Sequence, residues 1–324
     1  MSPKLDSRGE LGEHPAKASG TRGCFMKPID LGAVTLETVS EVERIAIDVG
    51  WMFPEAPPDW VELNRDWLDA RLVEPASGKI VIAMQSYVVR TRRHNILVDT
   101  CIGNHKERPS LAWMHRLDTA YLENLNRIGL RPEDIDTVLC THLHADHVGW
   151  NTRLVDGGWV PTFPKARYVM GRSEFDAFEA LHRKAPADQP VARGAFADSV
   201  LPVVASGQAD FVDAAHVVER ELGFGVWLES MPGHTPGHVG VHVRGPRGHA
   251  LLTGDAIHHP VQFTAPEVAM AADADRAAAA ATRRRIAETY ADGDTIILAS
   301  HFPLPTAGRV VRHRDHFRFR WLDD

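Results

Sequence analysis

The chain has 324 residues, 44% of them hydrophobic, which is enough for one large or two modest domains with a substantial core. Its formal net charge is −7, and its basic residues cluster only at 283–285 and 309–320, a balance that disfavours nucleic acid as a substrate. No apolar run reaches the length of a membrane helix, which argues against a membrane protein.

The N-terminal stretch is polar, so residues 1–30 are predicted to form a flexible arm and residues 31–324 a single domain. Residues 1–23 lack the apolar segment of a secretory signal, and we therefore expect a cytoplasmic protein. The 3 cysteines are far apart, which argues against a disulfide framework and agrees with a reducing compartment. The arm and a proline-rich loop, both additional to the core, suggest a homodimer.

Apolar runs and alternation predict the elements of the first half. Its strands are expected at 33–39, 43–49, 79–90, 94–99 and 136–140. The large apolar residues of 111–128 recur at helical spacing, so this segment is predicted as a helix. Prolines exclude regular structure from 51–60, which forms either a surface loop with aromatic anchors or a wall of a substrate pocket.

The second half alternates strands and helices in the same way. Its strands are expected at 167–170, 217–231, 239–243, 250–253 and 295–299. Helices are predicted at 173–181, where Ser173 can act as the N-cap, and at 273–290, which is rich in Ala and Arg. A Pro/Ala-rich connector occupies 184–194.

The most informative stretch is Thr141-His142-Leu143-His144-Ala145-Asp146-His147, directly after the strand at 136–140. A strand has period two, so His142 and His144 project from the same face, while Asp146 and His147 follow where the chain must turn. Imidazole and carboxylate are ligands of zinc and related divalent metals. The stretch therefore predicts parts of two adjacent metal sites.

Other potential ligands also follow apolar strands. Asp99, Asp255 and His301 stand at or just past strand ends, and His234 lies just after another strand. Since strand ends gather at one edge of a sheet, these residues can converge although they are distant in sequence.

This ordered set, from Asp99 through the His cluster to His301, resembles the metallo-β-lactamase superfamily of hydrolases. The resemblance implies an α/β fold, a four-layer αββα sandwich with two divalent metals, most often zinc, at one edge of the paired sheets. It implies that His142, His144 and His234 hold one metal and that Asp146, His147 and His301 hold the other. Asp255 would bridge both, and Asp99 would orient the cluster by hydrogen bonds.

Within the superfamily the chain is most similar to the branch of N-acyl homoserine lactone lactonases and methyl parathion hydrolase. The bridging residue is Asp255, as in that branch, and 254–263 is similar to the corresponding part of methyl parathion hydrolase. His258 occupies the position where such lactonases often have a Tyr that contacts the substrate carbonyl.

The expected function is a metal-dependent hydrolase in which a hydroxide shared by two metals cleaves a small ester or lactone, neutral and partly apolar. A phosphotriesterase or a hydrolytic dehalogenase could use the same hydroxide, and an oxygenase acting on thiols or persulfides could use one iron on the same fold. Asp146 is predicted to accept a proton. His258 either donates to the substrate oxygen or supports a metal ligand. Candidate pocket walls are Trp51, Phe53, Trp113, Trp150 and Phe263, although aromatic residues of this kind also form cores.

Overall fold

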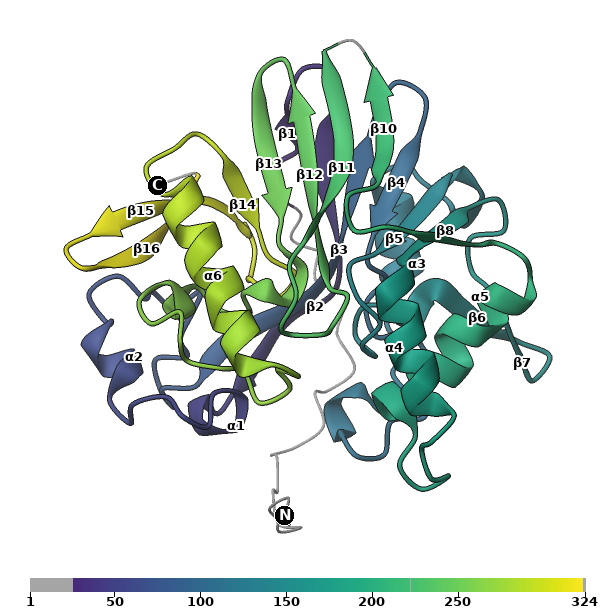
Figure 1. Ribbon diagram of the computed structural model, residues 1–324, viewed down its shortest axis with the longest axis horizontal. Coiled ribbons are helices and arrows are strands. Elements are labelled where there is room, and N and C mark those ends of the chain that lie inside the picture. The colour runs from purple at the N-terminus through teal and green to yellow at the C-terminus, as the bar shows by residue number, and fades with distance from the viewer. Residues whose placement is uncertain (1–25, 222, 323–324) are drawn as a thin grey trace.

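The computed structural model describes residues 26–221 and 223–322 (Figure 1). One sheet has the order β1-β2-β3-β4-β5-β8-β9, antiparallel from β1 to β4 and parallel from β4 to β9. Its strands are β1 (Ile29–Asp30), β2 (Thr35–Ile47), β3 (Ile80–Arg90), β4 (Asn95–Val98), β5 (Thr137–Cys140), β8 (Arg167–Gly171) and β9 (Ala209–Val212).

The second sheet follows the order β10-β11-β12-β13-β14-β15-β16 and is antiparallel except for the parallel pair β13 and β14. Its strands are β10 (Val217–Glu221), β11 (Phe224–Ser230), β12 (Val239–Gly245), β13 (Gly248–Leu252), β14 (Ile296–Leu298), β15 (Ala307–His313) and β16 (His316–Trp321). A separate hairpin joins β6 (Thr152–Val155) to β7 (Gly158–Pro161).

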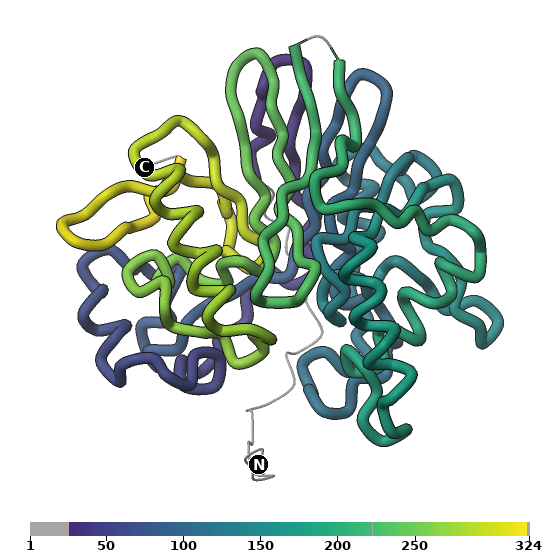
Figure 2. The backbone as a smooth tube through the Cα atoms, viewed as in Figure 1, coloured from purple at the N-terminus to yellow at the C-terminus, as the bar shows by residue number. Residues whose placement is uncertain are grey.

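The two sheets pack face to face, and Figure 2 shows the green strands of the second sheet lying over the purple strands of the first. Side chains alternate between the two faces of each strand. On β4, Ile96 and Val98 point into the core between the sheets, whereas Leu97 points outward. Val241 and Leu252 of the second sheet belong to the same central core.

Helices cover the outer faces of this pair of sheets. The helices are α1 (Val49–Met52), α2 (Trp60–Leu63), α3 (Tyr121–Arg127), α4 (Arg172–His182), α5 (Leu201–Ala205) and α6 (Arg276–Tyr290). Tyr121 of α3 and Phe178 of α4 pack on the outward residues of the first sheet, and Ile286 of α6 packs on the second. The predicted four-layer αββα sandwich is therefore confirmed (Figure 1).

Ser173, the predicted N-cap, lies inside α4, whose N-cap is Gly171. The segment 51–60, expected to lack regular structure, includes the end of α1 and the start of α2.

Two further predicted elements are wrong in extent. The helix predicted at 111–128 is a short 3-10 turn at Ala112–Met114 followed by α3, because Arg116 has a φ of 50°, which no right-handed helix includes. The strand predicted at 217–231 is two antiparallel strands, since Gly223 turns the chain with a φ of 93°.

Most of the predicted N-terminal arm, residues 1–25, lies outside the described residues, and β1 near its end pairs with β2. Among the residues that the structure describes, no helix is long and apolar enough to cross a membrane. The single domain and the homodimer stay predictions.

Candidate metal centre

Four strand ends deliver the predicted metal ligands to one edge of the sandwich. β5 ends at Cys140, directly before the loop 141–147. In the second sheet, β11 precedes His234, β13 precedes Asp255, and β14 precedes His301. β13 and β14 are neighbours in the second sheet, and neighbouring strands lie about 4.8 Å apart, so the short loops after these two strands reach a common point.

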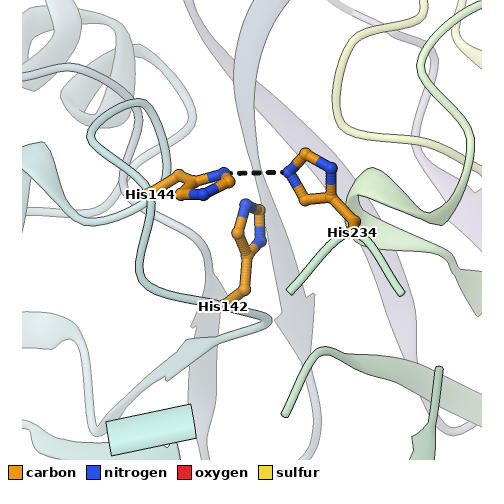
Figure 3. Close-up of side chains that lie close together, drawn as sticks. All are labelled: His142, His144 and His234. Carbon is orange, nitrogen blue, oxygen red and sulfur yellow. Dashed lines mark hydrogen bonds between the residues drawn. The ribbon is translucent and has the colours of Figure 1, made fainter. Parts of the chain in front are cut away.

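His142, His144 and His234 form the first group of possible metal ligands. One nitrogen of each ring lies within 4.8 Å of the others, and the three side chains converge from two loops (Figure 3). The Nδ1 atom of His144 lies 2.9 Å from the Nε2 atom of His234.

Asp146, His147 and His301 form a second such group. His301 Nε2 lies 3.7 Å from Asp146 Oδ2, and His147 Nε2 lies 4.0 Å from Asp146 Oδ1. The two neighbouring groups that the sequence predicts are thus both brought together in the fold.

Asp255 lies between the two groups. Its Oδ2 atom is 3.4 Å from His234 Nε2 in the first group and 3.2 Å from His147 Nε2 in the second. Its Oδ1 atom is 3.1 Å from His301 Nε2. A carboxylate so placed can contact an ion in either group.

Several buried nitrogens in this cluster fit a metal. The Nε2 atoms of His142 and His147 make no hydrogen bond with the described residues, a costly state unless another partner binds them. Burial and nearby imidazoles lower the pKa of His142 and His144 well below the usual value, so both rings are neutral, the form that binds metals. Burial alone would raise the pKa of Asp255, but His147 and His301 hold it well below its usual range. Imidazoles with carboxylates are a donor set suited to zinc.

The cluster opens into a cavity of about 290 Å³. His144, Asp146, Asp255 and His301 line its polar end. Arg193, His234 and His258 line it as well. Its larger apolar lining residues are Ile47, Trp51, Met52, Ile82, Met84, Leu111, Trp113, Met114 and Met270. The potential metal ligands are therefore accessible from an apolar pocket.

Residues 84–301 match the family described as the metallo-beta-lactamase superfamily, which is more than half of the chain. The chain belongs to this superfamily. Among its relatives is the N-acyl homoserine lactonase AiiA of Bacillus thuringiensis subsp. kurstaki, which is 26% identical over 220 residues, 63% of this chain and 77% of the relative. The lactonase AiiB of Agrobacterium fabrum is 26% identical over 206 residues, 59% of this chain and 69% of the relative.

Solved structures share the fold. The dizinc quorum-quenching lactonase AidC, in complex with a product, superposes with a TM-score of 0.70 at 21% identity, covering 92% of this chain and 97% of AidC. The hydrolase AbOPH superposes with a TM-score of 0.74 at 22% identity, covering 94% and 99%. The chain is thus a metallo-beta-lactamase superfamily hydrolase related to N-acyl homoserine lactonases.

Asp99 contacts the loop 141–147, here called the His loop. Its Oδ2 atom lies 2.9 Å from His147 Nδ1, and its Oδ1 atom accepts a hydrogen bond of 2.8 Å from the Thr141 backbone N–H. The Thr141 hydroxyl donates to Asp99 Oδ2 at 2.8 Å. These bonds orient the ring of His147 and the start of the loop.

Three supporting residues were missed in the sequence. Asp273, before α6, places Oδ1 3.0 Å from His234 Nδ1. Glu174 of α4 accepts hydrogen bonds from the backbone N–H groups of Leu143 (3.1 Å) and Gly237 (2.8 Å) and so links the two ligand loops. His238 accepts a 3.0 Å hydrogen bond from the Asp255 backbone N–H. Of the three, only His238 could have been suspected from the sequence, because it lies close to His234.

His258 lies inside the cluster. It is fully buried, its Nε2 atom is 3.1 Å from Asp255 Oδ2, and its ring stacks on that of His301 with centroids 5.7 Å apart. With His234 and Asp255 it forms a further group of possible ligands.

The predicted aromatic walls divide into two sets. Trp51 and Trp113 line the cavity. Phe53 and Phe263 belong instead to the core under α6, and Trp150 stacks on Tyr121 with ring centroids 5.4 Å apart. These three residues fill cores, because the burial of a large aromatic surface stabilises the fold.

Proposed function

We propose that this protein is a dinuclear metal hydrolase that cleaves a small, partly apolar ester or lactone. The observation that supports this most is the position of Asp255 between two groups of His and Asp side chains, at the end of an apolar cavity. The relatives AiiA and AiiB, named N-acyl homoserine lactonases, support the same substrate class.

In this proposal His142, His144 and His234 hold one ion, and Asp146, His147 and His301 hold the other, with Asp255 shared. When bound, two zinc ions would lower the pKa of water to roughly 7 and polarise the substrate carbonyl.

The chain's own residues then handle orientation and protons. Water adds to the carbonyl carbon, the bond from that carbon to the alcohol oxygen breaks, and a proton must reach that oxygen. The Asp146 side chain is 18% exposed and lines the cavity, whereas that of Asp255 is only 4% exposed. Asp146 is therefore the carboxylate that can accept the proton and transfer it to the leaving oxygen.

His258 also lines the cavity, with Nε2 close to Asp255. Burial lowers the pKa of His258, so its ring is neutral and carries one N–H. That N–H is proposed to donate to the carbonyl oxygen as negative charge develops on it. The alternative is that His258 holds Asp255 in place.

Metal content and a substrate panel test this function. Purified protein should contain two zinc ions per chain and hydrolyse lactones or p-nitrophenyl esters, and a chelator should abolish the rate until zinc is restored. Asp255→Ala should remove the activity together with metal. One iron per chain with oxygen uptake, or turnover of phosphotriesters alone, would contradict the proposal.

A further inference from the structure

Arg193 lines the cavity that contains the metal cluster. Among the lining residues in the described part of the chain it is the one Lys or Arg, and Asp146 and Asp255 line the same space. It lies in the connector after α4, outside both sheets, and the proposed hydrolysis makes no use of it.

The conformation of this connector is unusual. Ala192 and Arg193 have φ angles of 47° and 56°, a left-handed region that residues with a side chain seldom adopt. Gly194 follows with a φ of 97°, and a Cβ on it would lie 3.3 Å from Arg108 Nη1. The fully buried Arg108 donates to both carboxylate oxygens of Asp198, at 2.7 and 2.9 Å. A buried ion pair therefore supports the backbone that carries Arg193.

The guanidinium itself is held at one nitrogen. Arg193 Nη1 donates a 2.7 Å hydrogen bond to the Ser110 hydroxyl, next to Leu111 of the cavity wall. Within the described part of the chain, the Nε and Nη2 atoms of Arg193 have no hydrogen-bond partner. No carboxylate of the described residues lies within 4.0 Å of the Arg193 side chain. Nε and Nη2 form one edge of the planar group, the geometry that binds a carboxylate through two parallel hydrogen bonds.

The charge of Arg193 persists in this position. Burial lowers the pKa of Arg193 and the negative charge of Asp146 raises it, and the group stays protonated at neutral pH. The cavity thus has a positive charge at the connector, and Trp51 and Trp113 line the same space.

We propose that Arg193 binds a carboxylate on the substrate, so that the preferred substrate is an ester or lactone that carries an acidic group. The apolar body of this substrate contacts Trp51 and Trp113 while its carbonyl faces the metal cluster. This replaces the neutral substrate expected from the sequence, and it rests on the proposed hydrolase function.

The test uses paired p-nitrophenyl esters whose acyl chains have equal length and end in either a methyl group or a carboxylate. In the native enzyme kcat/KM should be higher for the carboxylate member, and Arg193→Gln should lower that value roughly ten- to a hundredfold, mainly through KM. The methyl member should change less than about twofold. Arg193→Lys should recover part of the preference, because it keeps the charge without the planar edge. Arg183→Gln serves as the control, because Arg183 is a surface residue directly after α4 and is paired with Glu179.

The ratio of kcat/KM for the carboxylate-ended ester to kcat/KM for the methyl-ended ester decides the inference. An equal loss for both members in Arg193→Gln, or no preference in the native enzyme, would overturn the role of Arg193 while leaving the hydrolase function intact. If neither ester is cleaved, the hydrolase function is refuted. The role of Arg193 can still be tested by the binding of uncleaved analogues. Calorimetry with the matching aryl amides, which resist hydrolysis, should then give tighter binding of the acid-ended amide, a preference lost in Arg193→Gln. Equal binding of both amides would refute the inference.

Discussion

The carboxylate of Asp273 and the ring of His234 form a buried pair, with Oδ1 3.0 Å from Nδ1. The other nitrogen of this ring, Nε2, faces Asp255 at 3.4 Å. Asp273 is held in turn by Arg283 of α6, whose Nη1 atom is 3.2 Å from Oδ2, and by the Met270 backbone N–H at 3.0 Å. His234 is therefore oriented from α6, and its Nε2 points toward Asp255 and His144 of the cluster.

Asp273→Asn should weaken zinc binding about 10- to 100-fold, the usual effect of removing a partner that orients a metal-binding His. Competition with a chromophoric chelator measures this affinity. Asp275→Asn is the control, since the Asp275 side chain only caps α6 through the Ala278 N–H. Unchanged affinity in Asp273→Asn would show that packing alone orients His234.

Glu174→Gln should destabilise the folded protein by about 1–3 kcal/mol, because an amide NH₂ cannot accept from a buried backbone N–H. Leu143 and Gly237 are the residues whose N–H groups compete for the remaining oxygen. Urea unfolding of the metal-free protein measures the change. Glu179→Gln removes only a surface ion pair with Arg183 and should change stability by less than about 1 kcal/mol.

His258→Phe separates the two roles of His258. If its N–H donates to the substrate oxygen, kcat should fall about 10²–10³-fold while the metal content stays at the native value. His258→Asn, which retains an N–H, should recover part of the rate. A loss of metal in both variants, with the rate per bound metal unchanged, would assign His258 to the support of the metal ligands.

His259 should make stability depend on pH. Its buried ring accepts from the Val261 N–H at Nδ1 and contacts the Leu72 carbonyl through Nε2, and burial lowers its pKa from 6.5 to about 4. As the pH falls, His259 therefore binds a proton in the unfolded chain at a higher pH than in the folded protein. The free energy of unfolding should decrease between about pH 6.5 and 4, by up to about 3 kcal/mol from this residue.

His259→Gln cannot take up this proton, so its stability should fall less steeply over the same range. Urea unfolding of both metal-free proteins at a series of pH values gives the two slopes. Identical slopes would mean that His259 is not held neutral in the folded protein.

The sequence by itself determined the ligand candidates, and its resemblance to the metallo-β-lactamase superfamily implied the layered fold. Asp99, His142, Asp255 and His301 each follow an apolar strand, and this local pattern places them at one edge of a sheet before any contact is known. The alternation of β4 likewise assigns Leu97 and Val98 to opposite faces. The strand-end positions and the alternation can be read from the sequence because each depends only on neighbours a few residues away.

Only the tertiary structure decided which side chains support and surround that edge. Asp273 reaches His234, and Glu174 reaches Gly237, across intervals that no local pattern records. Arg193 lines the cavity only because its connector, anchored by Arg108 and Asp198, packs beside the His loop. Such contacts form when helices and loops dock on the finished sheets, so their partners depend on the packing of the whole chain.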